Sequence, residues 1–140
     1  MGAQEAWTGG CQCGAVRYKI SSPPVELYVC HCRECQKQSS SAFGISAIFG
    51  RQDFRLTRGA VRSWTRGADS GRRVKCNFCA DCGARIWHED EDGQEPVVSV
   101  KGGSLDRPVD LTRATHIWVS RKLPGVVVPE GVLQFAEEPE

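Results

Sequence analysis

Cysteine spacing constrains the fold of this chain more than any other feature. Eight cysteines occur in 140 residues, and seven of them lie in the short motifs C-x-C, C-x-C-x-x-C and C-x-x-C. A short loop between two cysteines presents both sulfurs to one metal ion, whereas a disulfide between such near neighbours strains the bond geometry. The spacing therefore favours zinc-thiolate sites over a disulfide framework, and these sites must tie distant parts of the chain together.

The compartment expected from the N-terminal sequence agrees with metal binding. Disulfide frameworks belong to secreted chains, and clustered metal thiolates belong to reduced compartments. The first ten residues contain no basic start followed by an apolar run, so we expect no secretory signal and a cytoplasmic protein. No stretch approaches the roughly 20 apolar residues of a membrane span, so we expect no membrane association.

Ligand counts predict how the seven cysteines divide. A structural zinc site is closed by four protein ligands, and a catalytic site has three protein ligands and one open position. C-x-C and C-x-x-C together supply four thiolates for a structural zinc. We call this set the Cys tetrad, and it consists of Cys11, Cys13, Cys79 and Cys82. C-x-C-x-x-C supplies three thiolates for a second, catalytic zinc. We call this set the Cys trio, and it consists of Cys30, Cys32 and Cys35.

The donor set of the Cys trio indicates sulfur chemistry rather than hydrolysis. Three thiolates give a bound zinc ion a local charge of −1, which weakens the ion as a Lewis acid compared with a three-histidine site. Such an ion suits a soft fourth ligand, and a substrate thiolate is the obvious one. A zinc-bound thiolate remains nucleophilic at neutral pH, where a free thiol is mostly protonated.

Several residues near the motifs have more than one interpretation. Cys76 fits a small core residue better than an extra metal ligand. His31 lies between two ligands, and we expect its side chain to point away from them rather than toward substrate. We expect His88 and His116 to be strand residues of the core. The hydroxyls of residues 39–41 either bind a substrate carbonyl or cap the backbone, and the two readings have equal weight.

The rest of the sequence predicts a single all-β domain spanning residues 1–140, with antiparallel strands, long loops and little helix. Short β-branched or aromatic runs alternate with Gly, Pro and Asp turns. The expected strands are 15–20, 26–30, 43–49, 54–57, 61–65, 73–78, 85–88, 97–100 and 116–119. The one expected helix covers Arg33–Ser39. The four tryptophans, at positions 7, 64, 87 and 118, are expected in the core.

Charge is unevenly distributed along the chain. Residues 51–75 contain eight basic and two acidic residues, although the formal net charge of the whole chain is only +1. This segment is either a solvated hairpin or a basic rim that attracts an anionic substrate through Arg51, Arg58 or Arg62. The low net charge argues against nucleic-acid binding, which typically needs a strongly basic surface.

The cysteine motifs and their neighbours resemble the glutathione-dependent formaldehyde-activating enzyme family, also called the CENP-V/GFA domain. The resemblance lies in residues 10–18, 30–37, 78–83 and 116–124, and it extends over about residues 7–136. It implies an Mss4-like all-β fold and two zinc ions, with the same division into a structural and a catalytic site. It also implies a carbon–sulfur lyase, which in the reverse direction condenses formaldehyde with glutathione to S-hydroxymethylglutathione.

Two positions depart from the family pattern. The chain has Ser40 where the family usually has glycine after the Cys trio, and Gly125 where the family often has tryptophan. The resemblance implies a small thiol such as glutathione and a small aldehyde as partners. A non-catalytic glutathione- or zinc-binding module, or a nucleic-acid-associated one, is the alternative function. Both a monomer and a homodimer are compatible with the sequence.

Overall fold

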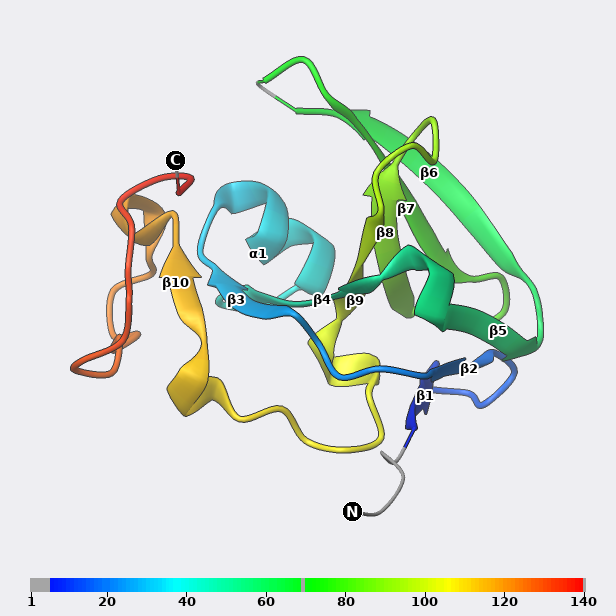
Figure 1. Ribbon diagram of the computed structural model, residues 1–140. Coiled ribbons are helices and arrows are strands. Elements are labelled where there is room, and N and C mark those ends of the chain that lie inside the picture. Colours follow the sequence, from blue (N-terminus) through cyan, green and yellow to red (C-terminus); the bar gives the residue numbers. More distant parts are fainter. Residues whose placement is uncertain (1–5, 69, 140) are drawn as a thin grey trace.

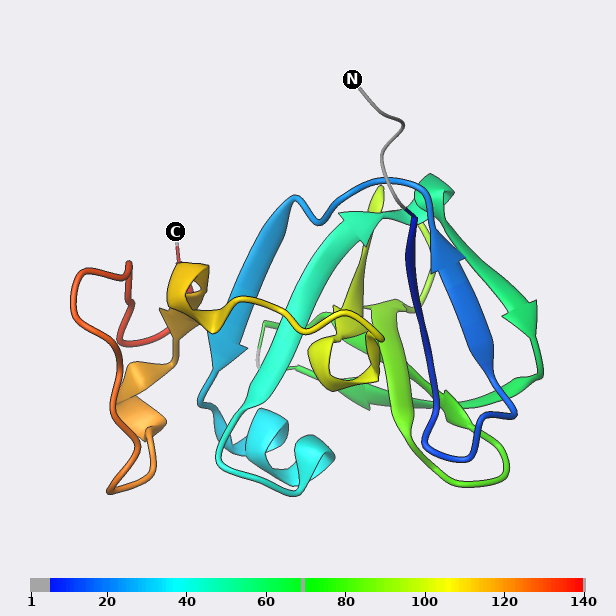
Figure 2. The ribbon, with the colours of Figure 1, turned by 90° about the horizontal axis from the view of Figure 1, so that it is seen from below.

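The strands form two sheets in the computed structural model, which describes residues 6–68 and 70–139 (Figures 1 and 2). The smaller sheet has the strand order β1-β2-β5 and the larger one the order β10-β3-β4-β9-β8-β7-β6. In both views the smaller sheet and the C-terminal segment lie at opposite ends of the molecule. The strands of the smaller sheet are β1 (Trp7–Gly10), β2 (Arg17–Ile20) and β5 (Phe54–Arg58). The strands of the larger sheet are β3 (Glu26–Cys30), β4 (Gly44–Gly50), β6 (Val61–Gly67), β7 (Arg73–Cys79), β8 (Arg85–Asp90), β9 (Val97–Lys101) and β10 (Thr115–Ile117).

The structure confirms the predicted all-β class with little helix. The one α-helix among the described residues, α1, covers Arg33–Ser39, as predicted. Strand β1 was missed because two of its four residues are glycine, which is disfavoured in strands. The larger sheet is mixed rather than wholly antiparallel, since β10 pairs with β3 in parallel. The described ranges also contain short 3-10 helices that were not predicted: η1 (Arg51–Asp53), η2 (Gly102–Ser104), η3 (Leu111–Arg113) and η4 (Val119–Arg121). Within the described ranges there is no helix with the length and apolar character that a membrane span requires.

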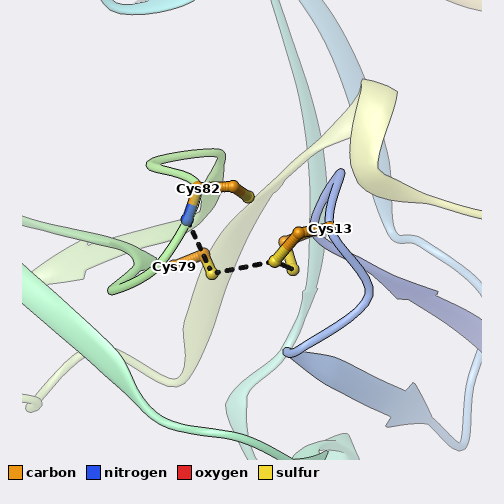
Figure 3. A group of neighbouring side chains, drawn as sticks. Cys13, Cys79 and Cys82 are labelled. Atoms are coloured by element: carbon orange, nitrogen blue, oxygen red, sulfur yellow. Dashed lines mark hydrogen bonds between the residues drawn. The ribbon is translucent and has the colours of Figure 1, made fainter.

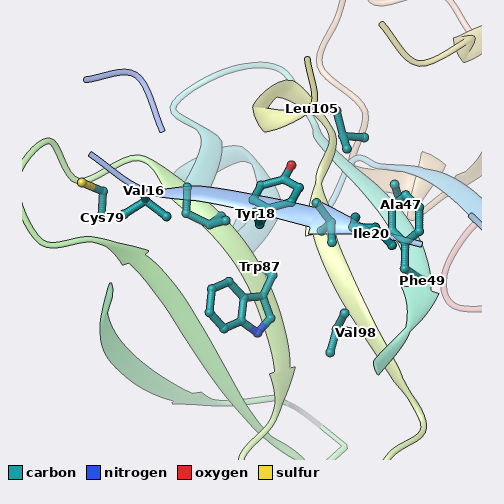
Figure 4. Packing of buried hydrophobic residues seen from close by; sticks show 11 residues of the cluster. Val16, Tyr18, Ile20, Ala47, Phe49, Cys79, Trp87, Val98 and Leu105 are labelled. Atoms are coloured by element: carbon teal, nitrogen blue, oxygen red, sulfur yellow. The ribbon is translucent and has the colours of Figure 1, made fainter. Parts of the chain in front are cut away.

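The apolar core lies between the two sheets (Figure 4). Side chains alternate between the faces of a strand, so the odd-numbered residues of β4 and the even-numbered residues of β9 share the inner face. The side chains that pack against this inner face come mainly from β2. The central members of this core are Tyr18, Ile20, Ala47, Phe49, Trp87, Val98 and Val100. The prediction that every tryptophan belongs to the core was wrong for Trp64, which is 53% exposed on β6.

The opposite face of the same central strands is polar. Ser46 of β4 lies directly across from Lys101 of β9, and Ser99 lies across from His88 of β8. Burial lowers the pKa of His88 to about 2, so this imidazole is neutral, and its Nε2 accepts a hydrogen bond of 3.1 Å from Arg85. This polar face forms one wall of the cavity beside the Cys trio.

Helix α1 ends at a serine in a conformation that favours glycine. Ser40 has φ 53° and ψ 41°, and its N–H reaches the carbonyl groups of Gln36 and Lys37. The backbone therefore keeps the left-handed turn that glycine usually supplies at this position. Gly125, the other position that departs from the family pattern, also has a positive φ, of 94°.

We expect Ser40→Gly to raise the free energy of unfolding by about 0.5–1 kcal/mol, because glycine adopts the left-handed conformation without a steric penalty. Urea denaturation of the two proteins measures this difference. Ser41→Gly is the matched control, because residue 41 is adjacent to Ser40 and does not have a positive φ. A variant at position 40 that is no more stable than the parent would show that Ser40 causes no strain.

Candidate metal centres

The Cys tetrad joins the turn after β1 to the turn after β7. The ligand atoms of its four members lie within 4.8 Å of one another, although about 66 residues separate the two motifs. The Sγ atoms of Cys11 and Cys13 are 3.6 Å apart. Those of Cys13 and Cys79 are 3.8 Å apart (Figure 3). The structure therefore brings together the four residues that the ligand count grouped.

Backbone N–H groups point at the sulfurs of the Cys tetrad. Cys79 Sγ accepts from the N–H groups of Asp81 and Cys82, at 3.3 and 3.4 Å (the second contact is drawn in Figure 3). Cys11 Sγ accepts from Val16 N–H at 3.2 Å. These contacts stabilise thiolates. They depend on tight turns in which Gly14 and Gly83 have φ of 83° and 82°, a conformation that glycine adopts without a steric penalty.

The Cys trio forms where β3 ends and α1 begins. Its three sulfurs also lie within 4.8 Å of one another, and Cys30 Sγ is 3.4 Å from Cys32 Sγ. Cys32 is the N-cap of α1, and its sulfur accepts from Cys35 N–H at 3.3 Å. Helix α1 packs closely on β4 at Gly44, where a Cβ atom would lie only 2.7 Å from Gln38 Nε2 and 3.4 Å from Cys35 Sγ.

The three thiols of the trio differ in acidity. The hydrogen bond from Cys30 lowers the pKa of Cys32, with a smaller contribution from Cys35. The same contact with Cys32 raises the pKa of Cys30. A metal ion would remove this difference, because it binds all three as thiolates.

Both cysteine sets fit a tetrahedral metal site. With metal–sulfur bonds of about 2.3 Å, two sulfurs of a tetrahedral zinc site lie about 3.8 Å apart. The sulfur separations of 3.6 and 3.8 Å in the Cys tetrad match this value, and 3.4 Å in the Cys trio is close to it. All eight cysteines are free thiols, so no disulfide competes for these sulfurs in the described part of the chain. The trio supplies one ligand fewer than a closed site needs.

A cavity of about 330 Å³ lies beside the Cys trio. The trio and the polar face of the larger sheet line it, together with Tyr28, Ile117 and the C-terminal residues Glu138 and Pro139. Its basic side chains are Arg66, Arg72 and Lys101. A second cavity, of about 870 Å³, lies between the Cys tetrad and the end of α1, and residues 39–41 line it.

The candidates for a basic rim are therefore not the ones that the sequence suggested. Arg51 forms ion pairs with Glu89 and Asp90, and it donates to Glu95 O at 2.8 Å. Arg58 donates to Gly14 O, and neither it nor Arg62 lines the cavity beside the trio. The sequence analysis did not single out Arg66 and Arg72. Which side chains reach the cavity depends on how the strands pair, and spacing along the chain does not show that pairing.

The predicted core residues near the motifs are buried. Cys76 is fully buried in β7 and belongs to neither cysteine set. His31 points away from the trio, as expected, and its Nε2 lies 2.9 Å from His116 Nδ1 in a buried pair. Ser39 Oγ donates to the carbonyl groups of Cys35 and Phe43, at 2.6 and 3.0 Å, so this hydroxyl caps the backbone.

Comparisons with known proteins agree with this arrangement. The family described as "Glutathione-dependent formaldehyde-activating enzyme" matches residues 6–121. A protein of Halomonas elongata named "Putative glutathione-dependent formaldehyde-activating enzyme" is 29% identical over 124 residues, which cover 81% of this chain and 75% of the relative. A crystal structure of a Rhodobacter sphaeroides protein is similar with a TM-score of 0.58 and 25% identity, and the alignment covers 78% of this chain and 98% of that one. The family match spans most of the chain and includes all seven clustered cysteines, so the chain belongs to the glutathione-dependent formaldehyde-activating enzyme family.

Proposed function

We propose that this chain is an enzyme that adds a small thiol, such as glutathione, to a small aldehyde, such as formaldehyde. This is the reverse direction of a carbon–sulfur lyase. The observation that carries the proposal is the difference between the two cysteine sets: one has four sulfurs, and the other has three beside a cavity of about 330 Å³. The names of the family and of the Halomonas relative support the choice of thiol and aldehyde.

In this proposal each cysteine set has its own role. The Cys tetrad holds a zinc ion that fixes the N-terminal turn to the end of β7, and the Cys trio holds a second zinc ion. At the trio, the bound ion would supply an open coordination position that keeps a substrate sulfur ionised at neutral pH. The chain contributes the rest: the end of β3 and the first turn of α1 fix the three sulfurs, and the cavity walls hold the thiol and the aldehyde next to each other.

The proposed reaction can be tested by exchange spectroscopy with ¹³C-labelled formaldehyde and glutathione. We expect the zinc-loaded protein to increase the exchange rate between free formaldehyde and S-hydroxymethylglutathione above the spontaneous rate. The Cys32→Ser variant at equal concentration is the control for general thiol and amine reactions. Glutathione binding without faster exchange would contradict the enzyme proposal and favour a binding module.

Arg66 is the residue that we expect to select an anionic thiol. Its half-buried side chain lines the cavity beside the trio, and it has no ion pair with the described acidic residues, whereas Arg72 pairs with Glu95 at 2.6 Å. Arg66→Ala should raise the KM for glutathione about tenfold, because one charge-assisted hydrogen bond to a carboxylate is lost. The KM for the uncharged thiol 2-mercaptoethanol should not change.

Arg62→Ala is the matched control for this variant. Arg62 lies on the same strand but is exposed and outside the cavity, so we expect no change in either KM. Equal effects of Arg66→Ala on both thiols would contradict a role in recognising the carboxylate.

A further inference from the structure

A buried ammonium group lies close to the Cys trio. Lys101, at the end of β9, is only 9% exposed, and lysine is almost never fully buried without a partner. Its Nζ donates to Ser46 Oγ at 3.0 Å, from the residue directly opposite on β4. Among the described residues Ser46 is the hydrogen-bond acceptor of this ammonium, so two of its three N–H donors have no protein partner.

The charge of the Cys trio compensates the charge of Lys101. Burial lowers the pKa of Lys101, and the nearby sulfurs of Cys35 and Cys30, when ionised, oppose that shift. Three thiolates with one divalent ion carry a net charge of −1, since −3 and +2 sum to −1. A protonated lysine is therefore balanced by the loaded trio, which reduces the energetic cost of burying it.

A second unpartnered donor lies on the same wall. Ser99 is two residues before Lys101 on β9, so both side chains are on the polar face of the sheet. Ser99 Oγ is buried without a hydrogen-bond partner in the described part of the chain. Ser46, Ser99 and Lys101 all line the cavity that contains the trio. An ammonium and a hydroxyl facing one small cavity are suited to bind an oxygen atom that becomes negative during a reaction.

We propose that Lys101, held by Ser46, binds the oxygen of the aldehyde in this cavity and protonates it as the thiol adds. The inference rests on the proposed function and assigns a catalytic residue to it. The thiolate sulfur forms the new C–S bond, and the π electron pair of the carbonyl group moves onto oxygen. The oxygen takes a proton from Lys101 Nζ. The next thiol releases its S–H proton to solvent as it ionises, and the amine takes one proton back from solvent. Atoms and charge balance without an oxidant or reductant.

Formate is a suitable probe, because it is only one oxygen atom larger than formaldehyde and its two oxygens share a negative charge. We expect ¹³C-labelled formate to bind the zinc-loaded protein, measured by line broadening in an NMR titration. Lys101→Met should weaken formate binding about tenfold or more, as expected for loss of a charge-assisted hydrogen bond. Lys19→Met, at an exposed position on β2, is the matched control and should bind formate as the parent does. Metal content and glutathione affinity should be equal in all three proteins.

Lys101→Gln is the second variant. It retains an N–H donor for Ser46 without the charge, so it tests the same inference if the methionine variant does not fold. Its formate affinity should also fall, by a smaller factor. Formate affinity equal to that of the parent in either folded variant would overturn the inference, and so would a parent protein that does not bind formate.

Turnover separates this inference from the proposed function. Lys101→Met should lower kcat for thiol addition about a hundredfold and leave the KM for glutathione unchanged, since the lysine contacts only the aldehyde. A loss of kcat with retained KM supports the assignment, and an unchanged kcat overturns it. If the parent protein binds formate through Lys101 but does not accelerate exchange, the reaction class is wrong and the oxygen-binding site stands.

Discussion

Cys82→Ser is expected to unfold the domain or to lower its free energy of unfolding by roughly 5 kcal/mol or more. A structural zinc ion contributes about 10–16 kcal/mol of apparent binding free energy to a folded metal-binding domain, and total protein stability is only about 5–15 kcal/mol. Cys82 is exposed, so the substitution removes almost no packing, and the loss of stability would come from the metal site alone.

Urea unfolding followed by circular dichroism, with excess zinc in the buffer, measures this effect. Ala80→Ser is the matched control, because residue 80 lies in the same exposed turn and is not a ligand. It should change stability by less than about 0.5 kcal/mol, as is usual for a surface substitution. A Cys82→Ser protein as stable as the control would mean that the Cys tetrad does not hold the fold together.

Cys32→Ser is expected to leave the fold intact and to abolish thiol addition, with a decrease in rate of at least about a hundredfold. The fold should persist because serine is a favourable N-cap, so it can replace the sulfur that accepts from Cys35 N–H at the start of α1. Activity should be lost because serine is not deprotonated at neutral pH and is a poor ligand for a soft metal site.

Exchange spectroscopy and circular dichroism on the same sample separate the two effects. Glu34→Ser, at an exposed position in the first turn of α1, is the control for changes in helix stability. Wild-type exchange rates in Cys32→Ser would contradict a catalytic trio. An unfolded Cys32→Ser protein would instead show that the trio is structural.

The sequence predicted the two cysteine sets but not the residues that line the cavity beside the Cys trio. Ligand counts grouped Cys11 with Cys79 across a long stretch of chain, since a tetrahedral site requires four donors regardless of the path between them. Helix α1 was also predicted with its observed ends, because a short polar segment follows Cys32. These features depend on local spacing and on coordination chemistry, and both can be read along one chain.

The residues that line the cavity are determined by which strands pair and in which register, and this pairing could not be predicted from the sequence. Lys101 lies opposite Ser46 because β4 and β9 pair in one particular register, although 55 residues separate them. A shift of one residue would move both side chains to the other face of the sheet. The same reason explains why Arg51, a predicted substrate ligand, is an ion-pair partner of Glu89 and Asp90 in the structure.

The central claim is that one chain holds two zinc ions in separate sites with different roles. Metal content per chain, measured by mass spectrometry on protein purified without chelator, tests it directly in the parent and in Cys32→Ser. We predict two zinc ions in the parent and one in the variant, with the same circular dichroism spectrum for both. One zinc ion in both proteins would contradict the claim, because the Cys trio would then hold no metal.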